Sequence, residues 1–487
     1  MTEYFELIAQ YMNKQNISMH MLAKRSGIDR STLYQFRRGE RMPSREQIIQ
    51  ISHVFTLSPS KQNELIEKWE IACVGSHLYH QRRTMQQLIR DLPVPIDESL
   101  SFHLSGQDQL PQQAALSSYS AVLLHICQLL RHAASIHSDL YLIAQPTEDQ
   151  LLDALLSSYP HDAGSIHHII CFDSGTEEDE TFYNLNCVPG LLKLGIHYPK
   201  YFLQYYYDNR EVRFSPMTPF PNLVLAKDCA MQISHDFRSA LVITDPEQVS
   251  LLHTMYDRMR SNTTPLAQQH HVTGLSQLIA SGNADAMMLP NLSGNEFFCF
   301  KSDIDLLQLL DRPILERNLR TAPENRERAL DTLTTFIEQY HAKLEPFKKH
   351  FILHPQRLRR FLETGCTDLL PRALYHPFCP ADRLLLLQRL LEKLESGQLV
   401  LHLCSGDAFM IADHWCIMFF PNNMLLLQYV EEDSLHYSLI SELVSAAALS
   451  DYYSYLLQQA EMRSPAQSRC YIEELLEEYR IRFEADR

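Results

Sequence analysis

The chain has 487 residues, of which 45% are hydrophobic, 21% are charged and 14 are glycine. This length suggests about three domains, or one small and one large domain, and the composition excludes an intrinsically disordered chain and favours helix. The formal net charge of −16 excludes a protein that is basic over its whole surface, so any contact with a polyanion has to be local.

The charge is unevenly distributed along the chain. Residues 1–75 carry ten Lys or Arg and eight Asp or Glu, a net charge of +2, whereas the remaining residues carry −18. Seven basic residues fall between Lys24 and Arg45, against two acidic ones, Asp29 and Glu40. A basic segment on an acidic chain indicates a local polyanion contact, although a solvated helix face would have the same composition.

Several classes of protein are not expected. The eleven cysteines contain no C-x-x-C, and their odd number argues against a complete disulfide framework. Glu3 and Glu6 argue against a signal peptide, and no apolar run approaches the ~20 residues that a membrane-spanning helix needs. We therefore expect a reduced, soluble, cytoplasmic protein with no membrane contact.

Residues 1–75 predict five short helices. Apolar residues recur at helical spacing from Phe5 to Met12. Gly27 is expected to end the second helix in the left-handed conformation, and Asp29 to cap the third, residues 30–38. The other boundary signals are Gly39 at the end of the third helix, Ser44 with Gln47 at the start of the fourth, and Ser58 with Pro59 at the start of the fifth.

The stretch MHMLAKRSGIDRSTLYQFRR, residues 19–38, resembles the helix-turn-helix family of the lambda-repressor/Cro type, also called the XRE family. The resemblance covers about residues 4–70. It implies that six residues hold the two helices of the motif together: Leu22, Ala23, Gly27, Ile28, Leu33 and Phe36. The sequence departs from the family at Met19, where Gln is common, and at Ser26, where an apolar residue is commoner.

The resemblance assigns the reading of DNA to the third helix and the loop after it. Candidates for base contacts, because Arg can pair with guanine and Gln with adenine, are Arg30, Gln35 and Arg38. Candidates for phosphates or a thymine methyl are Ser31, Thr32 and Tyr34. Residues expected to add charge towards the DNA backbone are Arg37, Arg41 and Arg45. Three alternatives remain: Tyr34 packs on a neighbouring helix, Arg37 or Arg38 pairs with Glu40, or the module docks a protein instead of DNA.

The remaining chain predicts a larger body. After a helix-turn-helix domain at residues 1–75, residues 76–98 predict a connector helix and a linker stiffened by Pro93 and Pro95. Helix patterns at 117–134 and 148–158 alternate with strand patterns at 139–145 and 166–173, and residues 302–395 are mostly helical in pattern. We expect an α+β protein, mainly helical, with a mixed α/β body in two halves, residues 99–300 and 301–487.

Two segments of the body, residues 223–259 and 409–443, share a pattern of strand, turn, strand, acidic turn and helix. Ala226 aligns with Ala412, and Asp245 aligns approximately with Glu431. Either an internal repeat of two sensor-like halves or a chance similarity accounts for this. The aromatic run at residues 198–209 is either core packing or a ligand-binding cage.

No sequence motif points to catalysis or metal binding. The chain contains no G-x-x-x-x-G-K-[ST], G-x-S-x-G or H-E-x-x-H. Adjacent histidines in a strand, such as His167 and His168 or His270 and His271, point to opposite sides. The spacing of His341, His350, His354 and Cys366 is too loose for a zinc site. We therefore expect no catalytic residue, cofactor or metal.

The sequence therefore predicts a transcriptional regulator that binds double-stranded DNA sequence-specifically. Its body is expected to form a homodimer and to sense a small-molecule or peptide effector. One alternative is an enzyme or scaffold that the helix-turn-helix tethers to DNA. Another is a peptide-sensing regulator with a helical-repeat body, against which the strand patterns weigh.

Overall fold

The computed structural model describes residues 3–92, 112–146, 149–174, 182–209, 218–282, 294–406, 409–421, 424–441 and 443–485. These residues form two compact units, the first of residues 3–84 with Phe182 and the second of the others. Helices account for 52% and strands for 19% of the described residues, which confirms a mainly helical α+β protein. None of the helices within the described ranges is long and apolar enough to cross a membrane.

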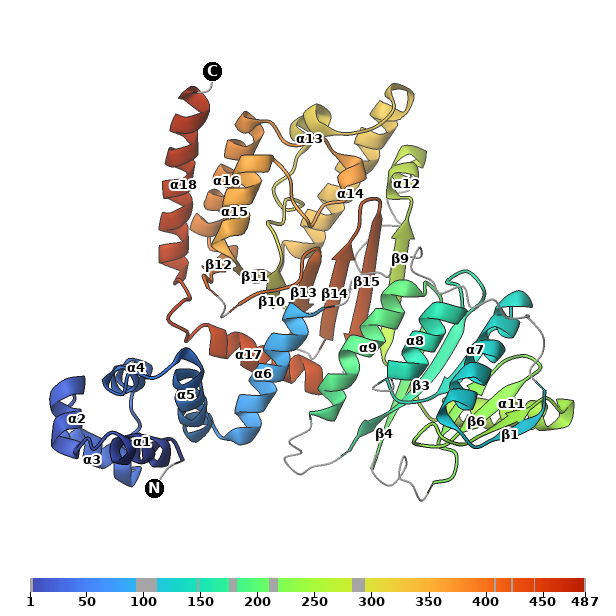
Figure 1. Cartoon of the computed structure of the whole chain (residues 1–487). Coiled ribbons are helices and arrows are strands. Elements are labelled where there is room, and N and C mark those ends of the chain that lie inside the picture. The colour runs from blue at the N-terminus through green and yellow to red at the C-terminus, as the bar shows by residue number, and fades with distance from the viewer. Residues whose placement is uncertain are drawn as a thin grey trace. The chain divides into compact units, whose positions relative to one another are not determined.

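The first unit is helical, as the sequence predicted (Figure 1). Its helices are α1 (Glu3–Lys14), α2 (Met19–Ser26), α3 (Arg30–Arg38), α4 (Arg45–Val54) and α5 (Pro59–Val74), and α6 (Ser76–Arg90) follows them. The predicted linker prolines, Pro93 and Pro95, and the acidic stretch at residues 177–180 lie outside the described residues.

Local signals explain the ends of these helices. Gly27 and Gly39 end α2 and α3 with a φ of 74° each, in the left-handed region that glycine adopts without strain. Ser44 and Gln47 form the predicted capping box of α4. Asp29 differs from expectation. It occupies the N-cap position of α3, but its side chain makes no capping hydrogen bond, and its backbone carbonyl accepts from Leu33 N–H at 3.0 Å.

The second unit contains two mixed β-sheets. The strands of the first sheet are β1 (Ala114–Leu116), β2 (Leu140–Ile143), β3 (Ile166–Asp173), β4 (Tyr201–Asp208), β5 (Asn222–Leu225), β6 (Ala230–Ile233), β7 (Ala240–Ile243) and β8 (Thr264–Pro265). The strands of the second sheet are β9 (Ala267–Thr273), β10 (Glu296–Lys301), β11 (Lys348–Leu353), β12 (Leu399–Leu403), β13 (Trp415–Phe419), β14 (Met424–Val430) and β15 (Ser434–Ser441). These sheets contradict the helical-repeat alternative.

Helices cover both sheets (Figure 1). Those of the first sheet are α7 (Tyr119–Ser135), α8 (Asp149–Ser158), α9 (Tyr183–His197) and α11 (Pro246–Arg260). The helices later in the chain are α12 (Leu275–Ser281), α13 (Arg312–Asn318), α14 (Arg326–Leu344), α15 (Pro355–Thr364), α16 (Pro380–Glu395), α17 (Leu443–Leu456) and α18 (Pro465–Ala485). Strands covered on both faces are apolar throughout, as in β13, where all five residues are buried.

The two sheets share a strand topology. In the first, β2, β3 and β4 are parallel neighbours, and β5, β6 and β7 continue from β2 as an antiparallel meander. In the second, β10, β11 and β12 are parallel, and β13, β14 and β15 continue from β10 in the same way. The two sheets therefore repeat one topology, which begins at β2 in the first sheet and at β10 in the second and extends beyond the predicted segments, residues 223–259 and 409–443.

The residue alignment predicted for this repeat is wrong by one strand. Ala226 follows β5, the first strand of its meander, whereas Ala412 precedes β13. Asp245 follows the last strand, β7, whereas Glu431 follows the middle one, β14. The apolar stretch that begins at Phe409 resembles a strand in sequence but does not join the sheet; Phe409 and Ile411 are buried, whereas Met410 is exposed. Its Ala412 N–H donates to the backbone oxygen of Ile89 at 3.1 Å.

The halves predicted at residues 99–300 and 301–487 remain a prediction. β9 lies wholly before residue 300, and β10 begins before it. Both strands belong to the second sheet. β9 pairs with β15 along seven residues, from Ala267 opposite Ile440 to Thr273 opposite Ser434. The last part of the first predicted half therefore contributes the edge strand of the second sheet.

Candidate nucleic-acid interface

The centre of the first unit is the packing of α2 against α3. Leu22, Leu33 and Phe36 have no exposed surface, and Ile28 is 6% exposed. Ala23 is partly buried against the same core. Burying this apolar surface favours one arrangement of the two helices, because their side chains fill the space between them.

Two contacts from outside the motif hold the last turn of α3 and the segment that follows it. The hydroxyl of Tyr4 on α1 donates to the backbone oxygen of Phe36, in the last turn of α3, at 3.3 Å. The indole N–H of Trp69 on α5 donates to the backbone oxygen of Pro43 at 3.0 Å. The sequence alone does not reveal these contacts, because the partners lie 26 or more positions apart along the chain.

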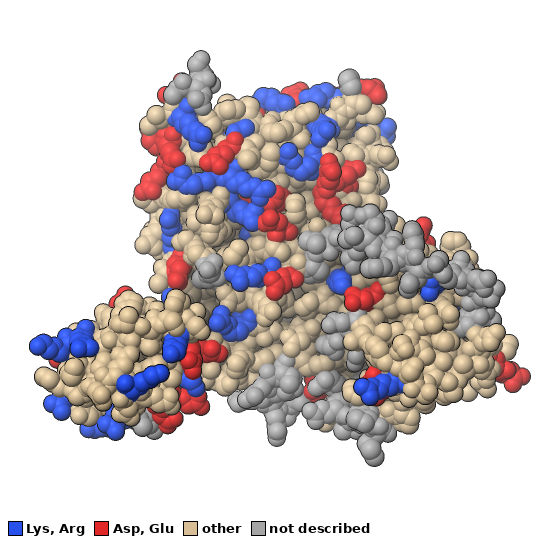
Figure 2. Space-filling view, viewed as in Figure 1, with Lys and Arg blue, Asp and Glu red and all other residues tan. Residues whose placement is uncertain are grey.

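The outward face of α3 is polar and basic. Five of its side chains are exposed, namely Arg30, Ser31, Gln35, Arg37 and Arg38, while Thr32 and Tyr34 are half-buried. Lys24, Arg25 and Arg41 are exposed on the neighbouring segments. Figure 2 shows Lys and Arg side chains gathered over the part of this unit where α2 and α3 lie. This surface has the charge and the donors that a DNA groove requires.

Arg30 and Tyr34 lie together, one turn apart on α3. The Arg30 guanidinium donates to the Tyr34 hydroxyl at 3.5 Å and lies 5.6 Å from the centre of the ring. This hydrogen bond and the charge of Arg30 lower the pKa of Tyr34. The ring of Tyr34 also packs against the hydrophobic core, so its inner part stabilises the fold while its hydroxyl remains at the surface.

Arg38 pairs with Glu40, as one of the alternatives anticipated. The pair is 3.3 Å long, and its side chains are 65% and 53% exposed. An exposed pair of this kind contributes only ~0–1 kcal/mol, so a phosphate or a guanine can compete for the Arg38 side chain. Arg37 and Arg41 are also exposed.

Arg45 is placed differently from the other candidate arginines. It is partly buried at the start of α4, and its charge acts on Glu70 of α5. Burial raises the pKa of Glu70, and Arg45 partly offsets that increase. The side chain therefore interacts within the fold, and this makes it the weakest candidate for a DNA contact.

The two departures from the family pattern have structural explanations. Met19 is 9% exposed and belongs to the hydrophobic core, whereas the adjacent His20 is exposed. A polar contact at this end of α2 would therefore come from His20 and not from Met19. Ser26 is buried, and its hydroxyl oxygen accepts from the Ile28 N–H at 3.3 Å, which satisfies an amide within the turn.

Four of the histidines considered for metal binding each have their own contacts. His168 contacts Tyr201 and the backbone of Ala144, whereas the neighbouring His167 stacks on Tyr141 and Phe202. Two others have separate roles: His341 donates to the Leu307 oxygen, and His354 caps α15.

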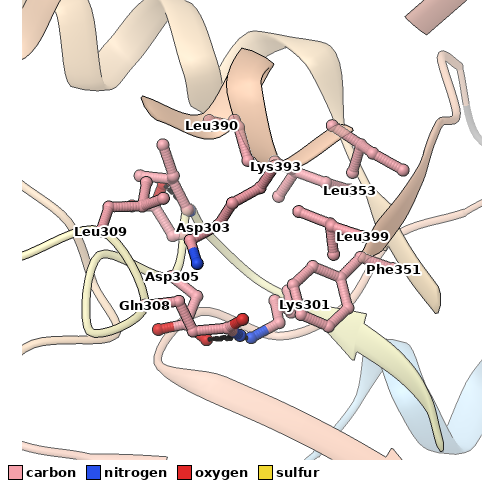
Figure 3. A pocket seen from close by; sticks show the side chains of 12 residues that line it. Lys301, Asp303, Asp305, Gln308, Leu309, Phe351, Leu353, Leu390, Lys393 and Leu399 are labelled. Atoms are coloured by element: carbon pink, nitrogen blue, oxygen red, sulfur yellow. Dashed lines mark hydrogen bonds and ion pairs between the residues drawn. The ribbon is translucent and has the colours of Figure 1, made fainter. Parts of the chain in front are cut away.

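The second unit contains a buried Lys–Asp pair that resembles a catalytic arrangement (Figure 3). Lys301 Nζ lies 2.6 Å from Asp305 Oδ2, and both side chains are less than 10% exposed. Burial alone would lower the pKa of Lys301, but the Asp305 carboxylate together with Cys416 and Cys299 outweighs burial and raises the pKa. The cavity beside the pair measures about 20 Å³, which is room for about one water molecule and not for a substrate.

A larger cavity lies between the first sheet and α11. Its volume is about 420 Å³, and its walls include Ile143, Tyr206, Leu223, Leu252, Tyr256 and Met259. Polar groups at its edge are Asp208, Asn209 and Gln232. Of the aromatic run at residues 198–209, Tyr206 lines this cavity, whereas Tyr198 and Tyr201 are buried. An apolar chamber with a few polar groups is typical of small-ligand sites.

Comparison with known proteins supports the assignment of the first unit. Residues 8–62 match the family model described as helix-turn-helix. A search of the curated proteins finds no match. Two solved structures similar to the chain are phosphatidylserine synthase from Haemophilus influenzae Rd KW20 and TrmBL2, an archaeal chromatin protein with a novel mode of DNA binding.

Neither solved structure establishes the fold of the body. The first is 13% identical over 84% of this chain and 98% of that chain, with a TM-score of 0.21. The second is 9% identical over 43% of this chain and 72% of that chain, with a TM-score of 0.22. The family model applies to the N-terminal segment alone, and residues 8–62 are therefore a helix-turn-helix domain of the XRE type.

Proposed function

We propose that the protein is a transcriptional regulator that binds operator DNA as a homodimer and whose body senses an effector without catalysing a reaction. The observation that carries this proposal is the exposed polar face of α3 within a helix-turn-helix domain. In this motif the second helix enters the major groove, where Arg and Gln side chains distinguish base pairs.

The charge distribution favours DNA over a protein partner for this face. Between Lys24 and Arg41 six basic side chains are exposed, on a chain whose net charge is −16. A protein-docking helix would present apolar anchors at its centre. The apolar residues of α3, Leu33 and Phe36, are instead buried within the domain.

The second unit supports the sensing part of the proposal. Its cavity of about 420 Å³ is of the size that binds small molecules, and it combines apolar walls with a few polar groups. The buried Lys301–Asp305 pair has no comparable space beside it, and this favours a structural role for the pair. To regulate, the effector must bind the DNA-competent and DNA-incompetent states with different affinities.

The test of DNA reading compares variants on one operator. The operator is selected from random DNA with the full chain, and affinity for it and for unrelated DNA is then measured. Gln35→Ala or Arg38→Ala should each lose about 1–3 kcal/mol on the operator and relax specificity at one base position. Arg25→Ala, an exposed charge on α2, is the matched control. It should weaken binding to both DNAs equally and reduce the salt dependence.

Unchanged discrimination in both α3 variants would remove the recognition-helix assignment. The sensing part has a separate test, in which metabolites and peptides are screened for a shift in the melting temperature of the full chain. A true effector should also change operator affinity by the linked amount. Turnover of such a ligand would favour the tethered-enzyme alternative.

A further inference from the structure

Three potential metal ligands from distant parts of the sequence meet in the second unit. His132 lies in the last turn of α7, and Asp228 and Cys229 lie in the turn between β5 and β6. One ligand atom from each residue lies within 4.8 Å of the other two. The sequence did not reveal this group, because 96 positions separate His132 from Asp228.

The carboxylate of Asp228 connects the three residues. His132 Nε2 lies 3.0 Å from one of its oxygens and 3.1 Å from the other. The carboxylate also interacts with the thiol of Cys229 through a side-chain hydrogen bond. The Asp228 carboxylate thus faces the His132 imidazole and the Cys229 thiol. Both groups become metal ligands when a cation replaces the protons that they share with the carboxylate.

The elements that carry these ligands are held in place by backbone contacts. Within the β5–β6 turn, Ala226 N–H donates to Cys229 O at 2.8 Å. Lys227 N–H donates to Ser138 Oγ, which follows α7, at 2.9 Å, and His253 of α11 contacts Ala226 O at 3.1 Å. Rigid elements of this kind keep a ligand set in position before the ion binds.

Solvent reaches the group from one side. The side chain of Asp228 is 43% exposed, whereas that of His132 is 9% exposed and Cys229 is fully buried. A cation can therefore enter past Asp228 and reach two ligands that are shielded from water. Water from the same side would supply a further ligand.

We propose that His132 Nε2, Cys229 Sγ and a carboxylate oxygen of Asp228 bind Zn²⁺ or a chemically similar divalent transition metal, with water as the fourth ligand. Zn²⁺ accepts nitrogen, sulfur and oxygen ligands in a tetrahedral arrangement. One thiolate and one carboxylate neutralise its charge, and the sulfur ligand disfavours Mg²⁺ and Ca²⁺. This site goes beyond the proposed DNA-binding function, and its ion would tie α7 to the β5–β6 turn.

Two features set the expected strength of binding. An imidazole that binds a metal through Nε2 carries its proton on Nδ1, and His132 Nδ1 is buried without a partner among the described residues. This lowers the affinity relative to a site whose histidine has an acceptor. The second feature is the thiol of Cys229, which is fully buried and binds a metal only after it gives up its proton.

Proton release accompanies the proposed binding. The thiol of Cys229 gives up its proton when its sulfur binds the cation, and His132 binds through Nε2 with a proton on Nδ1. The measured metal affinity should therefore fall as the pH is lowered.

The experiment titrates the chelator-treated full chain with Co²⁺, a spectroscopic substitute for Zn²⁺. We expect one equivalent to produce a thiolate-to-cobalt charge-transfer band, which Zn²⁺ abolishes. Cys229→Ser should lose the band. Cys404→Ser is the matched control, because Cys404 is also a fully buried free cysteine, and it should keep the band.

Asp228→Asn provides a second variant at a partly exposed position, where the fold should be preserved. We expect it to lower Zn²⁺ affinity at least tenfold and to leave the melting temperature of the metal-free chain unchanged. An undiminished cobalt band in Cys229→Ser would overturn the proposal, as would equal Zn²⁺ affinity of Asp228→Asn and the unmodified chain. Failure of Co²⁺ and Zn²⁺ to bind would show that the three residues form an ion pair and a hydrogen bond only.

Discussion

At the scale of single residues, His168 shows how burial fixes a protonation state. Its ring is fully buried between the Tyr201 hydroxyl, at 2.8 Å from Nδ1, and the Ala144 carbonyl, at 3.0 Å from Nε2. Burial lowers the pKa of His168 to about 4, and the hydrogen bond to Ala144 opposes the shift. The unfolded chain therefore binds a proton below about pH 6.5 that the folded chain excludes, and stability is lost as pH falls from about 6.5 towards 4.

We predict that His168→Gln reduces this acid sensitivity. Between pH 7 and pH 5 the unmodified protein should lose roughly 2 kcal/mol of unfolding free energy through His168, and the variant should not. The measurement is the calorimetric stability of both proteins at the two pH values. The exposed His20→Gln is the control and should behave like the unmodified chain. Equal acid-induced losses in all three proteins would contradict the prediction.

Asp303 changes stability with pH in the direction opposite to His168. The test therefore compares variants with the unmodified protein and does not interpret the pH dependence of one protein alone. This carboxyl is fully buried, and burial raises its pKa to about 7, against hydrogen bonds from the N–H groups of Asp368 and Ile304. The folded chain retains a proton that the unfolded chain loses above about pH 4. Its contribution to stability therefore falls as pH rises from about 4 to 7 and partly cancels that of His168.

At the scale of elements, the turn between α2 and α3 depends on one glycine. Gly27 has a φ of 74°, and a Cβ added there would meet no atom within 4 Å. Gly27→Ala should therefore cost only the backbone strain of a left-handed residue, roughly 1–2 kcal/mol of stability in the first unit. Gly27→Asn should cost less, because Asn adopts this conformation more readily.

The corresponding change in the second unit should be more damaging. Gly365 ends α15 with a φ of 68°, and an added Cβ would lie 2.8 Å from Phe378 N and also collide with Phe378 O. Gly365→Ala should combine strain with a backbone clash. Thermal unfolding of the two alanine variants would check the order, and a larger loss for Gly27→Ala would contradict it.

At the scale of the whole molecule, we predict a homodimer. One small helix-turn-helix domain reads only a few base pairs, and two half-sites about 34 Å apart supply the affinity that a specific operator requires. A closed two-fold dimer would match a palindromic operator. Multi-angle light scattering of the full chain with and without operator should give twice the chain mass. A monomer at micromolar concentration under both conditions would count against the dimer.

The sequence by itself determined the helices of the first unit. Capping boxes, left-handed glycines and helical spacing act over a few residues, so Ser44, Gln47, Gly27 and Gly39 could be read without the fold. The basic residues of α3 could likewise be identified from the sequence alone. Two N-cap side chains, those of Asp29 and Ser58, make no capping hydrogen bond. The helix starts are unchanged, because the backbone oxygen of each residue still accepts the first hydrogen bond of its helix.

The tertiary structure decided which distant segments meet. Alternating or apolar patterns predict a strand but not its partner. The pairing of β9 with β15 could therefore not be read from the sequence, and neither could the correspondence between the strands of the two sheets. The Trp69–Pro43 contact and the His132–Asp228–Cys229 group likewise join residues far apart in the chain. Such contacts depend on long-range packing, which brings side chains together irrespective of their spacing in the sequence.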